Sequence, residues 1–479
     1  MSLQLYDTWT RSVREFTSLK PGEVGLYTCG PTVYDYQHIG NYRTFMFEDG
    51  LKRVLKLNGY RVNHVMNITD VGHLVSDADD GEDKMEKGSR RTGKTAWDIA
   101  ALYTESFVGD LKLLGIDFPT TLCKATDNIP EQIAFVQEIE KKGYTYRTSD
   151  GIYFDTAKQP SYGYLGRLDI AGLQAGARVD LGEKKNSTDY ALWKFSKPED
   201  QRQMEWDSPW GRGFPGWHIE CSAMAHKYLG EYFDIHCGGE DHITVHHPNE
   251  ISQTEAAYGT RLANFWMHGY FILLHSAKMS KSSGEFLRVQ LLIDKGYDPL
   301  AYRYLCLTAH YRSQLTFSWD ALDAAAKGLE RLRMAVYALP VVTAANSSSD
   351  SLDGFQRKFL DLLNDDLNFP QALALTHEVV KSESLSGGEK RALVTLFDEA
   401  LGLQLTAWKP KGSDEVPANI REIADARWTA RTQKNWAEAD RLRSELTSLG
   451  WTMMDGNGAY SLSEGRGLHL VSPPTRGDA

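Results

Sequence analysis

The sequence lacks the features that mark membrane-spanning, secreted and nucleic-acid-coating proteins. No apolar run approaches the length needed to cross a bilayer, and the opening MSLQLYDTWTRSVREF lacks the basic-then-apolar order of a secretion signal. Five cysteines, an odd number in a long chain, fit a reducing compartment better than a disulfide framework. The net charge of -11 argues against a surface coated with basic residues, but does not exclude a local basic groove for RNA. We therefore expect a cytoplasmic protein with no membrane partner.

The chain of 479 residues is too long for one ordinary core, and 42% apolar residues predict a globular protein with several domains. Strand-like runs and most glycines fall in residues 22 to about 120 and about 205 to 275, which predicts an α/β domain interrupted by an insertion. The polar run 76–94 is expected to be a solvated loop. From Pro299 the apolar spacing becomes helical, and there is no internal repeat.

The stretch YTCGPTVYDYQHIGNYRTF, residues 27–45, joins a predicted strand to a predicted helix. An apolar run from Val24 stops at Gly30, and FMFEDGLKRVLKLNGY then has helical spacing and closes on Asn58 and Gly59. The alternating RVNHVMNI that follows predicts a second strand. We interpret the whole segment as the first crossover of a parallel sheet.

Ligands of parallel sheets bind outside the carboxyl ends of the strands, where helix N-termini favour anions. This location predicts a nucleotide or another phosphate. The stretch contains neither G-x-G-x-x-G nor G-x-x-x-x-G-K-[ST], so neither common phosphate loop applies. A different kind of nucleotide site is needed.

Two distant motifs supply that site. HIGN, residues 38–41, follows the first strand, and KMSKSSG, residues 278–284, follows the last strand-like run. Together, and in this order, they resemble the paired ATP signatures of the class I aminoacyl-tRNA synthetases. The resemblance implies a Rossmann-like catalytic domain, with catalytic roles for His38, Asn41, Lys278 and Lys281 and nucleotide contacts from Gly40, Gly238, Gly239 and Lys281.

Adenylate formation needs donors aimed at the charge that develops on the α-phosphate. His38, at a helix entrance, can donate to that phosphate, while Lys281, assisted by Lys278, can follow the leaving pyrophosphate. Asn41 stands where the commonest family pattern has histidine. Because its amide still offers a donor and an acceptor, we do not interpret Asn41 as a sign of inactivity.

Four further residues carry metal-ligand chemistry: Cys29, Cys221 in GWHIECSAM, and His246 with Glu250 in VHHPNEIS. The last two are spaced i, i+4, so they face the same side of a helix and suit one metal ion. Taken singly, a buried cysteine is more often an inert core residue, and His246 with Glu250 could be a simple helix-face pair. The set as a whole resembles the zinc site of cysteinyl-tRNA synthetases.

Three other cysteines and one histidine are assigned less directly. Cys123 and Cys306 lie in apolar runs and are expected to be core residues. Cys237, in HCGGED, is either a bystander or an occasional ligand. His247 rivals its neighbour His246, although the family's pattern favours His246.

The resemblance implies an α/β enzyme that activates L-cysteine with ATP to cysteinyl-adenylate, releases pyrophosphate and transfers cysteine to tRNA(Cys), with Mg²⁺ accompanying the nucleotide. One Zn²⁺ per chain would select cysteine, because serine's hydroxyl is a harder, less acidic ligand than a thiolate. Such discrimination can reach about 10⁴ to 10⁵ without editing, and no segment is large enough for an editing domain. The resemblance also places Trp217 as a pocket wall and Thr69 and Asp241 near the substrate's ammonium; each could instead be structural.

The implied domain division follows the same family. It comprises a Rossmann-like catalytic domain of residues 1–120 and 205–275, an inserted connective, acceptor-end domain of 121–204, a KMSKS and stem-contact region of 276–340, a helical bundle of 341–407 and a C-terminal anticodon-recognition domain of 408–479. In the last range, DARWTARTQKNWAEADRLRSEL predicts an amphipathic helix pair with arginines and two tryptophans suited to RNA.

Two rival functions share most of these motifs. A cysteine:glucosaminyl-inositol ligase of mycothiol synthesis has the adenylating core and zinc site but typically lacks the terminal module. A catalytically dead RNA-binding or regulatory relative would usually lose the phosphate-contacting residues, yet His38, Lys278 and Lys281 remain. The tail and the retained residues both favour a tRNA synthetase.

Overall fold

The computed structural model describes residues 1–71, 84–168, 183–197, 202–274, 287–340, 350–410, 416–455, 460–464 and 467–471. The chain divides into two compact units. The first comprises Met1–Asp323 with Leu360–Gln371, and the second Ala324–Phe359 with Ala372–Ala479. None of the helices in the described ranges has both the length and the apolarity needed to span a membrane.

A five-stranded sheet in which every neighbouring pair is parallel forms the centre of the first unit. Its order is β11 (Leu262–Gly269), β10 (Tyr232–Gly239), β3 (Glu23–Thr28), β4 (Arg61–Ile68) and β5 (Thr121–Lys124). The strands are mostly buried on both faces, as parallel strands covered by helices must be. The parallel crossover predicted from residues 27–45 is confirmed by the pairing of β3 with β4.

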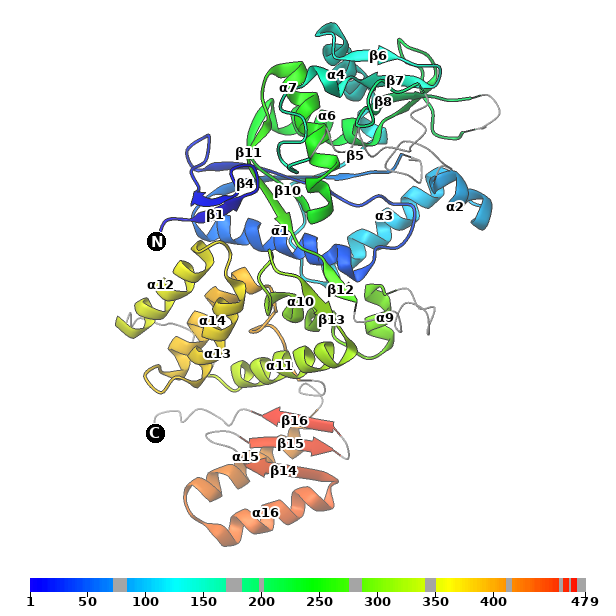
Figure 1. Ribbon diagram of the computed structural model, residues 1–479. Helices are drawn as coiled ribbons and strands as arrows, with labels where there is room; N and C mark the ends of the chain where they lie inside the picture. Colours follow the sequence, from blue (N-terminus) through cyan, green and yellow to red (C-terminus); the bar gives the residue numbers. More distant parts are fainter. Residues whose placement is uncertain are drawn as a thin grey trace. The chain divides into compact units, whose positions relative to one another are not determined.

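Helix α1 (Ile39–Leu57) lies on one face of this sheet, and α6 (Trp217–Leu229) and α7 (His246–Tyr258) lie on the other (Figure 1). His38 caps the first turn of α1, where its ring accepts the N–H of Gly40. Asn58 ends the helix by donating its backbone N–H to the last turn, as the sequence predicted. The helix thereby begins at the carboxyl edge of the sheet.

The remaining elements of the first unit surround this core. They are the hairpin β1 (Gln4–Asp7) and β2 (Ser12–Glu15), helices α2 (Lys84–Thr92), α3 (Ala96–Leu113), α4 (Ile129–Lys141), α9 (Val289–Asp294) and α10 (Pro299–Leu307), the pair β12 (Ile272–Leu274) and β13 (Leu315–Phe317), and the turns η1 (Thr126–Asn128), η2 (Thr156–Lys158) and η4 (Glu240–Ile243). A separate antiparallel sheet contains β6 (Thr145–Arg147), β7 (Gly151–Phe154), β8 (Tyr190–Phe195) and β9 (Gly213–Pro215).

Two local expectations from the sequence are wrong in part. The run 76–94 was expected to be a loop, but its described part contains α2, where Gly88 packs closely against Ile99 of α3. The run after Pro299 was expected to be helical, which α10 confirms, but Leu315–Phe317 form strand β13, which pairs with β12. In both cases a tertiary partner overrides the local pattern.

The expected domain limits stay a prediction, but two strands bear on where they fall. Strand β5 extends the parallel sheet and starts at Thr121, inside the range 121–204 assigned to the insertion. Strand β9 belongs to the antiparallel sheet yet lies within 205–275, assigned to the catalytic domain. The elements of the two sheets therefore interleave at these limits.

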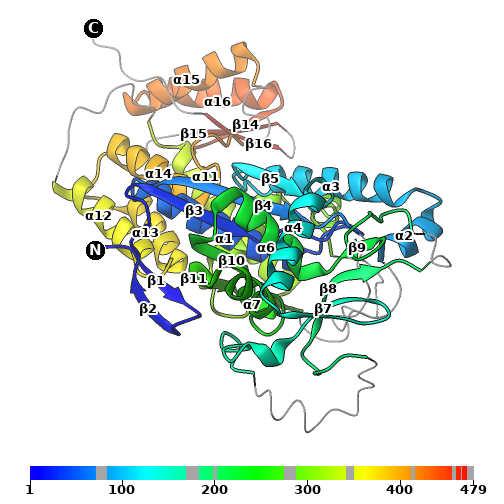
Figure 2. The same ribbon diagram turned by 90° about the horizontal axis from the view of Figure 1, so that it is seen from above.

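The second unit is largely helical and ends in a small sheet. It contains the later part of α11 (Trp319–Tyr337), most of α12 (Asp350–Asn364) and α13 (Phe369–Lys381), then α14 (Gly387–Leu401), α15 (Ala418–Thr432), α16 (Trp436–Ser448) and the antiparallel strands β14 (Trp451–Asp455), β15 (Tyr460–Glu464) and β16 (Gly467–Val471). Figures 1 and 2 both show α15 and α16 side by side against this sheet. Their shared core includes Ile420, Leu446, Trp451 and Tyr460.

Candidate functional site

A cavity of about 630 Å³ opens at the carboxyl edge of the parallel sheet. It is lined by the connection from β3 to α1, the first residue of α6, the end of β10 with η4, and the segment after β11. This is the edge at which parallel sheets bind their ligands, and the volume suits a nucleotide-sized molecule. We therefore take it as the candidate active site.

His38 lines this cavity, and its protonation is defined by α1. The Gly40 N–H donates to His38 Nδ1 over 3.0 Å, so the ring proton resides on Nε2. Burial lowers the pKa of His38 below its ordinary value, so the ring is neutral at pH 7. A neutral imidazole with its proton on Nε2 can act as a hydrogen-bond donor at the entrance of a helix.

The other predicted nucleotide residues divide into three groups. Gly40, Asn41 and Gly239 line the cavity with His38. Gly238 does not line it; a Cβ there would lie 2.4 Å from His242 Nδ1, so this glycine makes room for a histidine ring. Lys278 and Lys281 lie outside the described residues.

Of the three predicted substrate contacts, two line the cavity. Trp217, the first residue of α6, and the exposed Asp241 in η4 both border it. Thr69 is buried and accepts a hydrogen bond from Asn67 Nδ2 over 3.1 Å. Thr69 is not among the described residues that line the cavity, and its contact with the substrate stays a prediction.

The four predicted metal donors converge at the floor of the same region. One ligand atom from each of Cys29, Cys221, His246 and Glu250 lies within 4.8 Å of all the others, and all four residues are buried. They come from the β3–α1 connection, α6 and α7. Two sulfurs, one imidazole nitrogen and one carboxylate oxygen form a donor set typical of a tetrahedral zinc site. Cys29 also lines the cavity, which connects the donors to it.

The charges in this cluster are adjusted to one another. The pKa of Cys221 is lowered to about 7, first by a hydrogen bond from Cys29 and then, against burial, by the charge of His246. Burial alone would lower the pKa of His246, but Cys221 and Glu250 outweigh it and raise that pKa to about 10. Burial would likewise raise the pKa of Glu250, yet His236 and His246 lower it to about 2. The cluster therefore contains a thiolate and a carboxylate beside the protonated ring of His246. A divalent cation that binds the cluster would replace the proton of that ring.

A second group of four donors overlaps the first. Cys29 and Glu250 also lie within 4.8 Å of ligand atoms of His236 and His247. The structure therefore leaves both His246 and His247 as possible metal ligands, as the sequence did. Cys237 belongs to neither group among the described residues; it is fully buried in β10, where its carbonyl accepts the Cys29 N–H over 3.1 Å.

Sequence reasoning missed the histidines that surround the donors. His218 Nδ1 lies 3.0 Å from His246 Nδ1, His268 Nε2 lies 2.8 Å from His247 Nδ1, and His236 Nε2 lies 2.8 Å from Glu250 Oε2. Such outer partners fix the orientation of metal-ligating side chains. The three histidines lie in three separate elements, α6, β10 and β11. The only signal for them in the sequence was the high frequency of histidine between residues 218 and 268.

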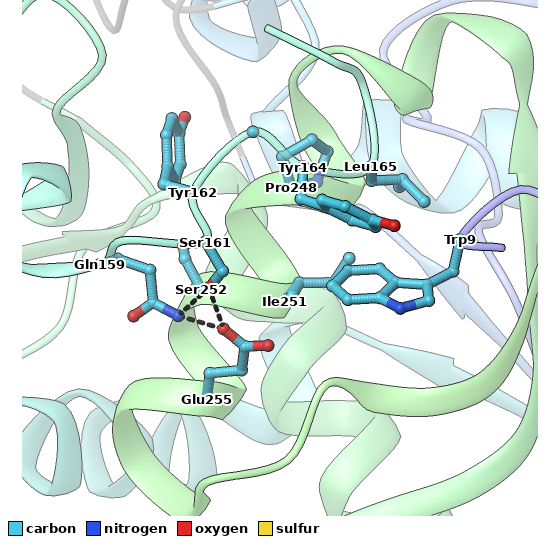
Figure 3. A pocket seen from close by; sticks show the side chains of 11 residues that line it. Trp9, Gln159, Ser161, Tyr162, Tyr164, Leu165, Pro248, Ile251, Ser252 and Glu255 are labelled. Carbon is cyan, nitrogen blue, oxygen red and sulfur yellow. Dashed lines mark hydrogen bonds between the residues drawn. The ribbon is translucent and has the colours of Figure 1, made fainter.

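The face of α7 that points away from the cluster is held by the segment 159–165 and by Trp9 (Figure 3). Gln159 and Ser161 both donate to the Glu255 carboxylate, and Tyr162 Oη donates to Asn249 Oδ1 over 2.7 Å. The pocket among these side chains has about 10 Å³, no more than one water needs, so we assign the contacts to holding α7.

Comparison with known proteins identifies the family of this fold and cavity. The model for the class I (C) tRNA synthetase catalytic domain matches residues 15–327. Cysteine–tRNA ligase 1 of Burkholderia lata is 59% identical over 456 residues, which is 95% of both chains, and the cysteine–tRNA ligase of Novosphingobium aromaticivorans is 44% identical over 475 residues, again 95% of both. The cysteine–tRNA ligase of Treponema denticola is 41% identical over 485 residues, 96% of this chain and 99% of its own.

Solved structures share the fold at much lower identity. A leucyl-tRNA synthetase of Agrobacterium radiobacter in a ternary complex with tRNA has a TM-score of 0.58 at 12% identity, covering 82% of this chain and 86% of that one. Methionyl-tRNA synthetase of Mycobacterium tuberculosis with methionyl-adenylate has a TM-score of 0.54 at 13% identity, covering 80% and 90%. These likenesses confirm the expected Rossmann-like fold class. The chain therefore belongs to the cysteine–tRNA ligase family of the class I tRNA synthetases.

Proposed function

We propose that this chain activates L-cysteine with ATP at the carboxyl-edge cavity and transfers it to tRNA(Cys), with one Zn²⁺ selecting the side chain. Members of the family use ATP, an amino acid and tRNA as substrates. The proposal of zinc-dependent cysteine activation rests on one observation: Cys29 and His38 line the same cavity. The proposed thiol-binding donors and the proposed phosphate-binding helix N-terminus therefore meet there.

In the first step a carboxylate oxygen of cysteine attacks the α-phosphorus of ATP, and the bond from that phosphorus to pyrophosphate breaks. The Nε2–H of His38 donates to the α-phosphate oxygens as their charge grows, supported by the N-terminus of α1. Gly40, Asn41 and Gly239 line the same cavity and would border the nucleotide. We assign Lys278 and Lys281, with Mg²⁺, to the leaving pyrophosphate, on the family resemblance alone.

Selection of cysteine rests on the donor cluster. When bound, the zinc ion would supply a soft Lewis acid that accepts a thiolate and not a hydroxyl or a methyl group. Cys29, Cys221, His246 and Glu250 would hold it, and the lowered pKa values of Cys221 and Glu250 favour the anionic forms that bind a cation. Trp217 would wall the pocket and Asp241 would face the ammonium group.

For the tRNA we propose the acceptor end near residues 121–204 and the anticodon at 408–479. Two arginines of this region, Arg427 and Arg431, form ion pairs with Asp455, so their charges are already partly neutralised within the protein. Trp428 packs on the core of this region, whereas Trp436 is 58% exposed at the start of α16. Trp436 and the neighbouring Lys434 are therefore the better candidates for a base and a phosphate.

The cellular compartment is part of the same proposal. All five cysteines are free thiols, and those of the donor cluster must be reduced to bind a metal. A cytoplasmic location meets this requirement.

The test is ATP–pyrophosphate exchange with cysteine and with serine, followed by transfer to tRNA(Cys). We expect exchange with cysteine, discrimination against serine of about 10⁴ or more, and zinc near one ion per chain by elemental analysis. Trp436→Ala should leave exchange unchanged and weaken transfer, whereas Met454→Ala, at another exposed apolar residue of the same region, should leave both exchange and transfer unchanged. Exchange with cysteine but no transfer to tRNA would favour ligation to a small-molecule amine, and no exchange would reject the proposal.

A further inference from the structure

Glu250 has two carboxylate oxygens, and the structure gives them different partners. Oε1 faces the donor cluster, 3.2 Å from His246 Nε2 and 3.9 Å from Cys29 Sγ. Oε2 points the other way and lies 2.8 Å from His236 Nε2. Both Glu250 and His236 are fully buried, so Oε2 is out of contact with bulk solvent. A buried carboxylate oxygen without a donor would be costly, which makes the His236 contact important to Glu250.

His236 is held rigidly enough to define this contact. It lies in the middle of β10, paired with Tyr27 of β3 and Trp266 of β11. Its ring stacks on Trp266 with 4.6 Å between centroids and 19° between planes, and it meets the Tyr27 ring at 5.0 Å. Among the described residues its Nδ1 has no hydrogen-bond partner, so the ring has one polar contact to direct it. The Nε2–H therefore points at Glu250.

We propose that His236 is a positioning residue that keeps Glu250 as a one-oxygen ligand and thereby places the metal between Cys221 and His246. The inference rests on the proposed zinc site. The two overlapping donor groups share Cys29 and Glu250, so they offer one ion two competing positions. In the competing position His236 would itself be a ligand. A histidine nitrogen whose proton is donated to Glu250 cannot also bind a metal, so the contact to Glu250 selects the position beside Cys221 and His246.

The two roles of His236 predict different behaviour for a conservative substitution. A glutamine amide can place an N–H donor near the position of the imidazole Nε2, but an amide is a poor zinc ligand. If His236 only orients Glu250, His236→Gln should preserve metal binding and His236→Ala should not. If His236 is a ligand, both substitutions should weaken binding to a similar extent.

The experiment measures zinc affinity of the full chain by competition with a chromophoric chelator and records the absorption spectrum of the Co²⁺ form. We expect His236→Ala to weaken zinc affinity by about 10- to 100-fold and His236→Gln by no more than about threefold. The Co²⁺ form of His236→Gln should keep the thiolate-to-metal bands of the wild type. Cys221→Ser should reduce those bands, because one of two sulfurs is lost.

Buried-histidine controls come from His64, which lies in β4 of the same sheet and contacts the Thr28 hydroxyl at 2.9 Å. His64→Ala and His64→Gln remove a buried imidazole that belongs to neither donor group among the described residues, and should change zinc affinity by less than about threefold. Circular dichroism of the metal-free variants checks that each is folded.

Three results would overturn the inference. Wild-type affinity in a folded His236→Ala would show that the contact does nothing for the metal. Equal losses in His236→Gln and His236→Ala, with Co²⁺ bands that survive Cys221→Ser, would make His236 a ligand. A wild-type protein that binds neither zinc nor Co²⁺ would reject the proposed site itself together with this inference, and so is distinguished from the first two results.

Discussion

The parallel sheet has a hollow at each end, and the two differ in what their polar groups do. The carboxyl-edge cavity, about 630 Å³, adjoins converging thiols, imidazoles and a carboxylate. The amino-edge cavity, about 340 Å³, is lined by the starts of β3, β4 and β10. There Asp234 accepts the N–H groups of Leu19 and Gly25 at 2.6 and 2.8 Å, and Arg61 pairs with Glu23. At the amino edge the charges are used to hold the chain together.

The comparison shows that concavity and charge do not by themselves mark a site. At the carboxyl edge, ligand atoms from the β3–α1 connection, α6 and α7 lie within 4.8 Å of one another. At the amino edge Asp234 is occupied by two backbone N–H groups, and Arg61 and Glu23 pair with each other. This difference gives a set of predictions in which substitutions at the two edges have unequal effects.

The largest effect is expected for Cys221→Ser. A hydroxyl is a poor substitute for a thiolate as a zinc ligand, so zinc affinity and cysteine-dependent pyrophosphate exchange should each fall by more than about 100-fold. The matched control is Cys306→Ser, because Cys306 is buried but belongs to neither donor group among the described residues. Retention of zinc by Cys221→Ser with normal exchange would contradict the assignment of the donors.

His38→Ala should lower the rate of adenylate formation by about 10² to 10³, because one donor to the transition-state charge is removed. The apparent affinity for cysteine should change little, since His38 is not a metal donor. Single-turnover adenylation and the KM for cysteine separate these quantities. Asn63→Ala, an exposed residue of the amino-edge cavity, is the control. An effect of His38→Ala confined to the KM for cysteine would contradict the proposed role.

A smaller effect is expected for Tyr162→Phe, which removes the hydrogen bond from Tyr162 Oη to Asn249 of α7. The free energy of unfolding should fall by about 1 kcal/mol. Because α7 carries His246 and Glu250, zinc affinity should also fall severalfold. Chemical denaturation and metal competition measure the two quantities. Tyr232→Phe at the amino edge, whose hydroxyl makes only a 3.4 Å surface contact, should change neither.

The smallest effect on activity is expected for Asp234→Asn at the amino edge. Replacing one carboxylate oxygen by an NH₂ group leaves one of two backbone N–H groups without an acceptor, so stability should fall by about 1 to 3 kcal/mol. Cysteine-dependent exchange by the folded protein should stay within about twofold of wild type. A loss of exchange in folded Asp234→Asn would contradict the view that the polar groups of the amino edge serve the fold and not the activity.

Local sequence was sufficient for the elements that frame the carboxyl edge. Strand β4 occupies the residues of RVNHVMNI, and α1 ends at Asn58, because hydrophobic period and capping residues agree there. It was insufficient for α2, whose helix packs on α3 through Gly88 and Ile99. No pattern within residues 76–94 indicates that this segment packs against α3.

The donor cluster, too, could be predicted only in part from the sequence. The types and spacing of Cys29, Cys221, His246 and Glu250 were readable in the sequence, chiefly through a resemblance, and the structure brings the four together. The contact of His236 with Glu250 could not be predicted, because it depends on the distance between β10 and α7. Nor could sequence foresee that Gly238 lies under His242 and outside the cavity lining.

The parallel pairing of β3 with β10 has a consequence for synthesis of the protein. Cys29 and Glu250 are 221 residues apart, so at about 5 to 20 residues per second the ribosome makes the first about 10 to 40 s before the last. Until then the nascent N-terminal half would have to keep Cys29 reduced without help from the proposed metal. All four donors exist only after β10 and α7 have been made, so uptake of the ion would mark the synthesis of α7, before β11 completes the parallel sheet.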